Sequence, residues 1–258
     1  MKGMVARARR ELGPGRARAW WAIAALCLFL LLALIAVDVM HRLYYTHGLF
    51  PQLRHWRFNS DADQSISEMV GYVQSLIAHG ALLYLGVKLK DAWTHIVLGQ
   101  TMLLIFLDDY LRLHETMRET FIDVLGIQPA FGVRAEDIGE LIAWAVLGIP
   151  ALLLLVLAWR YSGERARSQA KLIVVGLAIL VFFAVVVDMT AVFLEEFGIA
   201  PGAVGWEGRA YFALTVIEST GELAGQSIVM VLALYFLFEQ LEERDRLTHP
   251  RPHTAERG

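Results

Sequence analysis

Acidic side chains and histidines interrupt stretches that are otherwise hydrophobic, and these residues are the candidates for chemistry. Asp38 and His41 form a D-x-x-H pair, whose spacing places a carboxylate and an imidazole on one face of a helix. A Glu-x-x-His of the same spacing supplies ligands in carboxylate-bridged di-metal bundles. The pair therefore suggests a metal site shared by carboxylates and imidazoles.

Three further segments carry the same ligand types. Asp108, Asp109, His114 and Glu115 fall within residues 107–115, Asp188 stands alone, and Glu218 and Glu222 are four residues apart. Carboxylates mixed with imidazoles suit Fe, Mn or Zn better than Ca or Mg. The expected ligands of one or two such ions are Asp38, His41, Asp108, His114, Asp188, Glu218 and Glu222. We expect Asp109 and Glu115 to orient ligands or to act as catalytic general bases.

The elements that must position these residues are membrane-spanning helices. The 258-residue chain is 57% hydrophobic and only 19% charged, and its apolar residues come in blocks of about 20, the length that crosses a bilayer. We expect an all-α bundle of six spans, at residues 20–41, 66–88, 93–119, 138–159, 171–196 and 209–238. A basic arm (1–19) precedes this transmembrane domain (20–240), and a charged tail (241–258) follows it.

The distribution of basic residues predicts the orientation. Lys and Arg concentrate in the N-terminal arm and in the loops after the second and fourth spans, and short basic loops stay in the cytoplasm. Both termini are therefore expected in the cytoplasm, with the loops 42–65, 120–137 and 197–208 outside. In a bacterial inner membrane the outer side is the periplasm.

The deepest carboxylates are expected to share one layer. Counted at 1.5 Å per residue, Asp38, Asp108, Asp188 and Glu222 lie roughly 22–27 Å from the cytoplasmic end of their helices. Together with their neighbours they would cost on the order of 10 kcal/mol if left ionised and unpaired. Bound cations, shared protons or a water-filled cavity must offset that cost. For the shallower acids, simple pairing with Arg42, Arg112 or Arg118 is the alternative.

Two of these segments resemble a group of bacterial multi-pass membrane proteins. The run Leu107-Asp108-Asp109 followed by His114-Glu115 is similar to their L-D-[DE]-x4-H-E pattern. Glu218, Glu222 and Gly225 are similar to their E-[ES]-x2-E-x2-G pattern. The resemblance covers two of the six expected spans. It implies a polar site built from these residues, without implying a particular reaction.

Other classes of protein fit the sequence less well. Alkaline-ceramidase-like hydrolases typically have seven spans and an H-x3-H zinc motif, whereas this chain has six expected spans and no such histidine pair within them. Its single cysteine, Cys27, excludes an intramolecular disulfide and a thiolate metal cage. A net charge of −3 argues against nucleic-acid binding.

The leading hypothesis is a metal-dependent membrane enzyme, either a hydrolase or an oxidoreductase. It would act on a lipid or another apolar substrate reached from the outer leaflet. The alternatives are a proton- or cation-coupled transporter and a non-catalytic subunit of a membrane complex. The protein is also expected to contact membrane lipid directly, and a homo-oligomer is compatible with the sequence.

Overall fold

The structure is a computed structural model that describes residues 2–130, 133–195, 197–199 and 205–248. The described residues form helices, turns and loops without a β-strand, so the expected all-α class is confirmed. The elements in chain order are α1 (Lys2–His47), η1 (Pro51–Leu53), η2 (Trp56–Phe58), α2 (Ile66–Lys88), α3 (Trp93–Leu111), α4 (Leu113–Leu125), α5 (Ala135–Tyr161), α6 (Glu164–Val181), η3 (Phe182–Val187), α7 (Asp188–Glu195) and α8 (Trp206–Thr248).

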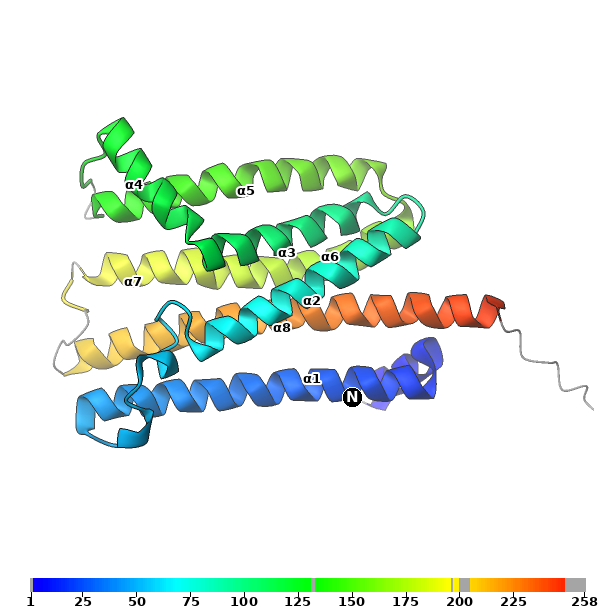
Figure 1. Ribbon diagram of the computed structural model, residues 1–258, viewed down its shortest axis with the longest axis horizontal. Helices are drawn as coiled ribbons and strands as arrows, with labels where there is room; N and C mark the ends of the chain where they lie inside the picture. Colours follow the sequence, from blue (N-terminus) through cyan, green and yellow to red (C-terminus); the bar gives the residue numbers. More distant parts are fainter. Residues whose placement is uncertain (1, 131–132, 196, 200–204, 249–258) are drawn as a thin grey trace, which may run out of the picture.

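Five segments are long and apolar enough to cross a membrane. They are 11–47 in α1, all of α2, all of α5, the continuous stretch 164–195 and all of α8. Figure 1 shows the long helices running lengthwise beside one another, with the chain reversing direction between them. The 19-residue helix α3 runs within the same bundle but is not one of the five.

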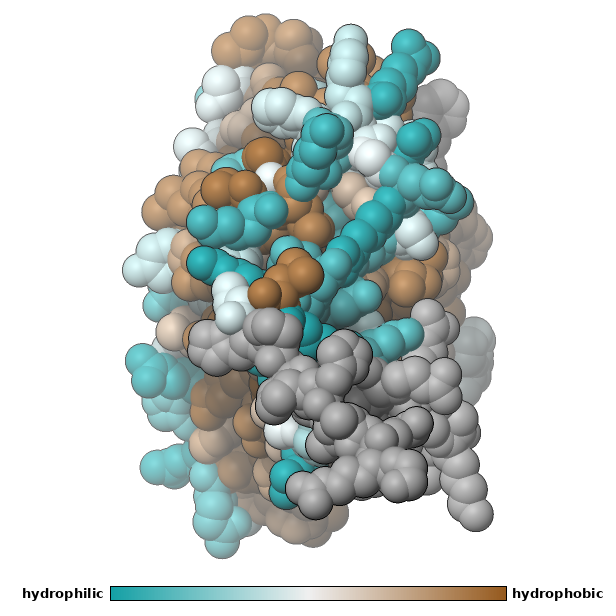
Figure 2. Space-filling view, turned by 90° about the vertical axis from the view of Figure 1, so that its right-hand side faces the viewer, coloured by the Kyte–Doolittle hydropathy of each residue, from teal (hydrophilic) through white to brown (hydrophobic). Residues whose placement is uncertain are grey.

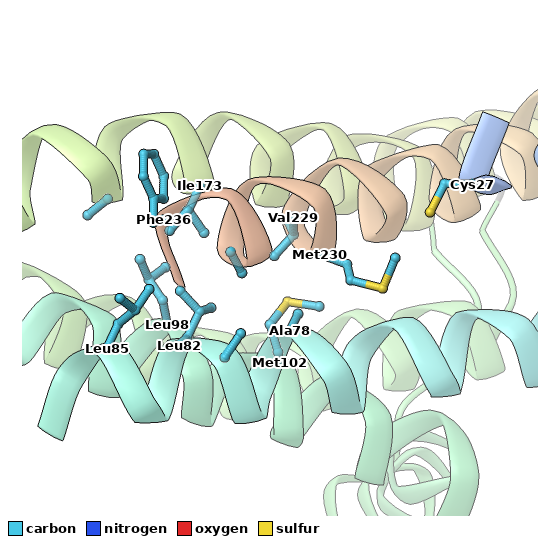
Figure 3. Close-up of a cluster of buried hydrophobic side chains, with 13 residues drawn as sticks. Cys27, Ala78, Leu82, Leu85, Leu98, Met102, Ile173, Val229, Met230 and Phe236 are labelled. Carbon is cyan, nitrogen blue, oxygen red and sulfur yellow. The ribbon is translucent and has the colours of Figure 1, made fainter. Parts of the chain in front are cut away.

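Helix α8 is the centre of the bundle, because it packs against α1, α2, α6 and η3. One half of its length lies in a hydrophobic core with α2, α3 and α6, shown in Figure 3. Leu82, Leu98, Ile173 and Val229 of this core are almost completely buried. Burial of side chains of this kind stabilises a fold by about 1.5–3 kcal/mol each in water. Inside a bilayer the same close packing acts through van der Waals contacts.

The third helix ends early. We expected one helix over 93–119, and this was wrong, because the chain breaks at Arg112, whose backbone is left-handed (φ 54°). The residues beyond the break form α4, which packs along α5. Consequently the half of the bundle that holds the carboxylates lacks a full-length helix where α3 would have continued (Figure 1).

The fifth span is continuous but irregular. Between α6 and α7 it passes through η3, a π-helical segment. π-helical segments inside α-helices are rare and are frequent at functional sites. The ring of Phe183 in η3 lies over Gly221, where it leaves no space for a Cβ. One turn further along α8, a Cβ on Gly225 would lie 2.7 Å from the Leu180 backbone.

The basic arm and the charged tail do not stand apart from the bundle. Leu12 and Ala17 are buried against α8, and Arg16 bridges Glu242 and Asp245, each at 2.6 Å. Figure 2 looks onto this end of the bundle, where hydrophilic residues gather. Residues 249–258 of the expected tail and 200–204 of the last outer loop lie outside the described residues.

The loop between α1 and α2 is held down by Arg42. Its guanidinium donates to Asp38 (2.9 Å) and Asp61 (2.6 Å) and to the hydroxyl of Thr215 on α8 (2.9 Å). The remaining oxygen of Asp38 accepts from the backbone N–H of Ser60 (2.9 Å). These bonds attach residues 60–61 to both α1 and α8.

We predict that Gly225→Ala lowers the thermal stability of the protein in detergent. The added methyl group meets backbone atoms of Leu180, so two helices must separate, at a cost of about 1–3 kcal/mol. Gly148→Ala on α5 is the matched control, because nothing lies within 4 Å of its Cβ position. Thermal unfolding followed by tryptophan fluorescence compares them. Equal melting temperatures for Gly225→Ala and the wild type would contradict the close α6–α8 contact.

We predict that Arg42→Gln destabilises the outer loop together with the fold. The substitution leaves Asp38, only 4% exposed, without its ionic partner, and breaking a buried pair costs about 3–5 kcal/mol. Limited proteolysis should then cut faster within residues 48–65. Arg57→Gln, an exposed arginine in the same loop, serves as the control. Unchanged cleavage in Arg42→Gln would show that the loop is held by other contacts.

Candidate functional site

An acidic cavity of about 420 Å³ occupies the space beyond the end of α3. It lies between α2, α3, α4, α5, the α6–α7 segment and α8, with loop residues 60–63 beside it. No lysine or arginine is among the described residues that line it, and His114 is the single histidine. The lining carboxylates are Asp61, Asp63, Glu68, Asp109, Glu140, Asp188, Glu195, Glu218 and Glu222.

The cavity does not continue into the other half of the bundle. Its apolar lining residues include Ile105, Leu180 and Leu223. One to two turns further along the same helices, Met102, Ile173 and Val229 belong to the hydrophobic core. The site is therefore a pocket closed at its inner end by packed side chains.

Asp108 and His114 form a unit across the break at Arg112. The left-handed turn lets the backbone N–H of His114 donate to Asp108 Oδ1 (2.8 Å). Nδ1 of the same imidazole lies 3.2 Å from Asp108 Oδ2, but the angle between the two groups does not make a hydrogen bond. Nε2 lies 3.6 Å from Glu140 Oε1. Asp108 thus stands behind the ring, and Nε2 faces the cavity.

This arrangement matches a common feature of metal sites, in which a carboxylate holds one imidazole nitrogen while the other binds the ion. Asp108, Asp109 and His114 each offer a ligand atom, and these atoms lie within 4.8 Å of one another. Asp109 lines the cavity, whereas Asp108 does not. Asp109 therefore faces the cavity, whereas Asp108 is the carboxylate that contacts both the backbone and the ring of His114.

Three other expected ligands face the same cavity from different helices. Asp188 comes from the start of α7, and Glu218 and Glu222 come from one face of α8. Glu222, Glu218, Asp109 and Asp188 line the same cavity, so their charges repel one another when they are ionised. The cavity therefore concentrates negative charge that an ion, protons or water must offset.

Besides Asp108, three expected site residues do not line the cavity. Asp38 is engaged by Arg42 and Ser60, as described above. His41 is only 5% exposed, and its Nδ1 lies 2.6 Å from the carbonyl oxygen of Leu53. Glu115 pairs with the exposed Arg112 on the outer surface. The D-x-x-H pair thus fastens the loop between α1 and α2 to α1, and neither residue lines the cavity.

Sequence reasoning left out carboxylates that the structure places in the site. Glu136 and Glu140 are four residues apart on α5, the same spacing as Glu218 and Glu222 on α8. This shared spacing was the signal in the sequence that could have added Glu140 to the site. Asp61 and Asp63 come from a loop whose path no periodic pattern indicates. Glu68 also faces the cavity, but the hydroxyl of Tyr72 and the backbone N–H of Gln64 both donate to it.

An ion-pair cluster lies at the outer rim, where α5 and α7 approach. Arg134 donates to both oxygens of Asp137 (2.8 and 2.9 Å) and lies 3.5 Å from Glu195. The hydrogen bond to Asp137 raises the pKa of the Arg134 guanidinium above its ordinary value, so this cation persists at any physiological pH. Arg118 lies 3.4 Å from Glu140 on the same side.

Comparison with known proteins gives a family and no function. Neither the curated proteins nor the solved structures contain a match to this chain. A family model described as a domain of unknown function, DUF8692, matches residues 66–238. That range contains every cavity-lining residue except those of the loop 60–63. The chain therefore belongs to the DUF8692 family.

Proposed function

We propose that the protein crosses the membrane six times with both termini in the cytoplasm. The sixth crossing is α3, which runs within the bundle beside the five segments that meet the length and hydropathy requirement. The basic loops after α2 and α5 support this orientation. It makes the acidic cavity face the outer side, which is the periplasm in a bacterial inner membrane.

The cavity is proposed to hold one or two divalent transition-metal ions, Fe, Mn or Zn. The observation that carries this proposal is the lining itself, with nine carboxylates, one imidazole and no lysine or arginine among the described residues. Four of the nine, Asp61, Asp63, Glu140 and Glu195, pair with arginines outside the lining. Asp109, Asp188, Glu218 and Glu222 have no arginine or lysine partner among the described residues, and they form the core of the proposed site. Asp109, His114, Glu140, Asp188, Glu218 and Glu222 are the ligand candidates, and carboxylates with one imidazole suit these ions.

The ions would serve hydrolytic or oxidative chemistry on a lipid or another apolar substrate. A metal in such a site activates water at neutral pH and polarises a carbonyl or phosphoryl oxygen. The walls around the acids are partly apolar, with Trp144, Val181 and Leu223 among them. A pocket with a closed inner end and mixed walls favours a reaction chamber over a conduit.

We predict one or two equivalents of Fe, Mn or Zn per chain in protein purified in mild detergent. Elemental mass spectrometry should find them lost in the Asp109→Asn/His114→Ala double variant, which removes two lining groups. Glu119→Gln, an exposed carboxylate on α4, should retain the metal and is the matched control. Absence of metal from the wild type after reconstitution would overturn the proposal and leave a proton relay or a complex subunit.

We predict that Asp108→Asn weakens metal binding by about 10–100-fold without changing the stoichiometry at saturation. The amide oxygen of Asn still accepts from the His114 backbone N–H, so the turn is kept while the charge behind the imidazole is lost. Competition with a chromogenic chelator measures the affinity. Loss of stoichiometry would instead make Asp108 a direct ligand, and unchanged affinity would remove its orienting role.

Cation-coupled transport is the second candidate, favoured by the break at Arg112 and the π-helical segment, because transporters bind ions at irregular helices. The hydrophobic core beneath the cavity must then open in each cycle. Proteoliposomes containing a metal-sensitive dye separate the two functions. Metal uptake that Asp109→Asn abolishes would establish transport, whereas bound metal without uptake favours the enzyme.

A further inference from the structure

The cavity comes close to the lateral surface of the bundle between α5 and the η3–α7 segment. Helix α5 packs against α3 and α4 and has no comparable contact with α6, η3 or α7. A shallow groove follows this line, which we call the lateral seam. It is lined by Leu141 and Trp144 of α5 and by Ala184, Val185 and Met189 of η3 and α7.

The seam is continuous with the acidic cavity. Glu140, Trp144, Ala184 and Asp188 line both. The ring of Trp144 lies 5.6 Å from the imidazole of His114, centroid to centroid, so it separates the seam from the candidate metal ligands. A molecule that displaces or slides past this indole from the bilayer side meets His114 next.

Polarity changes along the seam in the order found along an outer-leaflet lipid. Glu140 and Asp188 mark its outer end. One helical turn deeper, about 6 Å, the facing residues are Trp144 and Ala184. The lipid's ester and headgroup region would lie at the carboxylate level, and an acyl chain would lie along the apolar part.

The seam has boundaries at both ends. The Arg134–Glu195 ion pair (3.5 Å) joins α5 to α7 above it. At the other end, α3 packs against both α5 and α6 and fills the space between them. The seam therefore lies at the level where α3 has ended.

We propose that the lateral seam is a portal through which the ester region of an outer-leaflet glycerophospholipid reaches the acidic cavity, while one of its acyl chains lies along the apolar part of the seam. The route deepens the proposed function and rests on it only for the reaction at the inner end. Trp144 is the gate, since it is the side chain shared by the seam and the imidazole contact.

The test is quenching of Trp144 fluorescence by phosphatidylcholine brominated on its acyl chains, in vesicles containing the full-length protein. Subtracting the signal of Trp144→Phe isolates this indole from the other tryptophans. We expect brominated lipid to quench Trp144 and Ala184→Phe, which fills the seam, to remove most of that quenching. Val186→Phe adds the same bulk to a neighbouring residue that is 50% exposed and should leave the quenching unchanged.

Leu141→Phe fills the seam from the α5 side and repeats the test if Ala184→Phe fails to fold. Trp144 that is not quenched, or quenching that persists in both filled variants, overturns the portal. The measurement is made with and without added metal, so the two proposals fail separately. Quenching without bound metal leaves the portal standing alone, and bound metal without quenching leaves the metal site standing alone.

Discussion

The structure depends on one constraint, which is that like charges crowded away from bulk water must be offset by something other than protein cations. Nine carboxylates share the cavity with one imidazole, and four of them pair with arginines, whereas Asp109, Asp188, Glu218 and Glu222 have no arginine or lysine partner among the described residues. In a medium of low dielectric constant the repulsion between such groups is several-fold stronger than in water. An empty, dry and fully ionised cavity would therefore be unstable, and cations, protons or water become part of the folded state.

The shape of the bundle follows from how the protein makes room for that charge. A full-length α3 would fill the space of the cavity, and the left-handed residue Arg112 prevents this by ending α3 and sending α4 along α5. The same turn brings His114 back over Asp108. The conformation of one residue thus leaves room for the cavity and places His114, its only lining histidine among the described residues. It also leaves α5 without close packing against α6, η3 and α7.

The helices could be predicted from the sequence more fully than the site. Apolar blocks predicted the five segments that are long and apolar enough to cross a membrane. Ser65 caps α2, with its hydroxyl accepting from the Glu68 N–H (3.2 Å), as serine commonly does at a helix start. The break at Arg112 left no such signal, because neither a glycine nor a proline stands at or next to it. The spacing of Asp38 and His41 shows that they share a face, but only long-range packing decides what that face meets. Here it meets the loop.

The central position of α8 has a consequence for biosynthesis. α2 and α8 are the least hydrophobic of the five candidate spans, and α8 is the last of them to leave the ribosome. A segment carrying Glu218 and Glu222 partitions poorly into lipid by itself. Its contacts with α1, α2 and α6 supply the polar and close-packed surroundings that lipid lacks. Integration of α8 is therefore coupled to the prior arrival of its neighbours, and the order of translation is also the order of assembly.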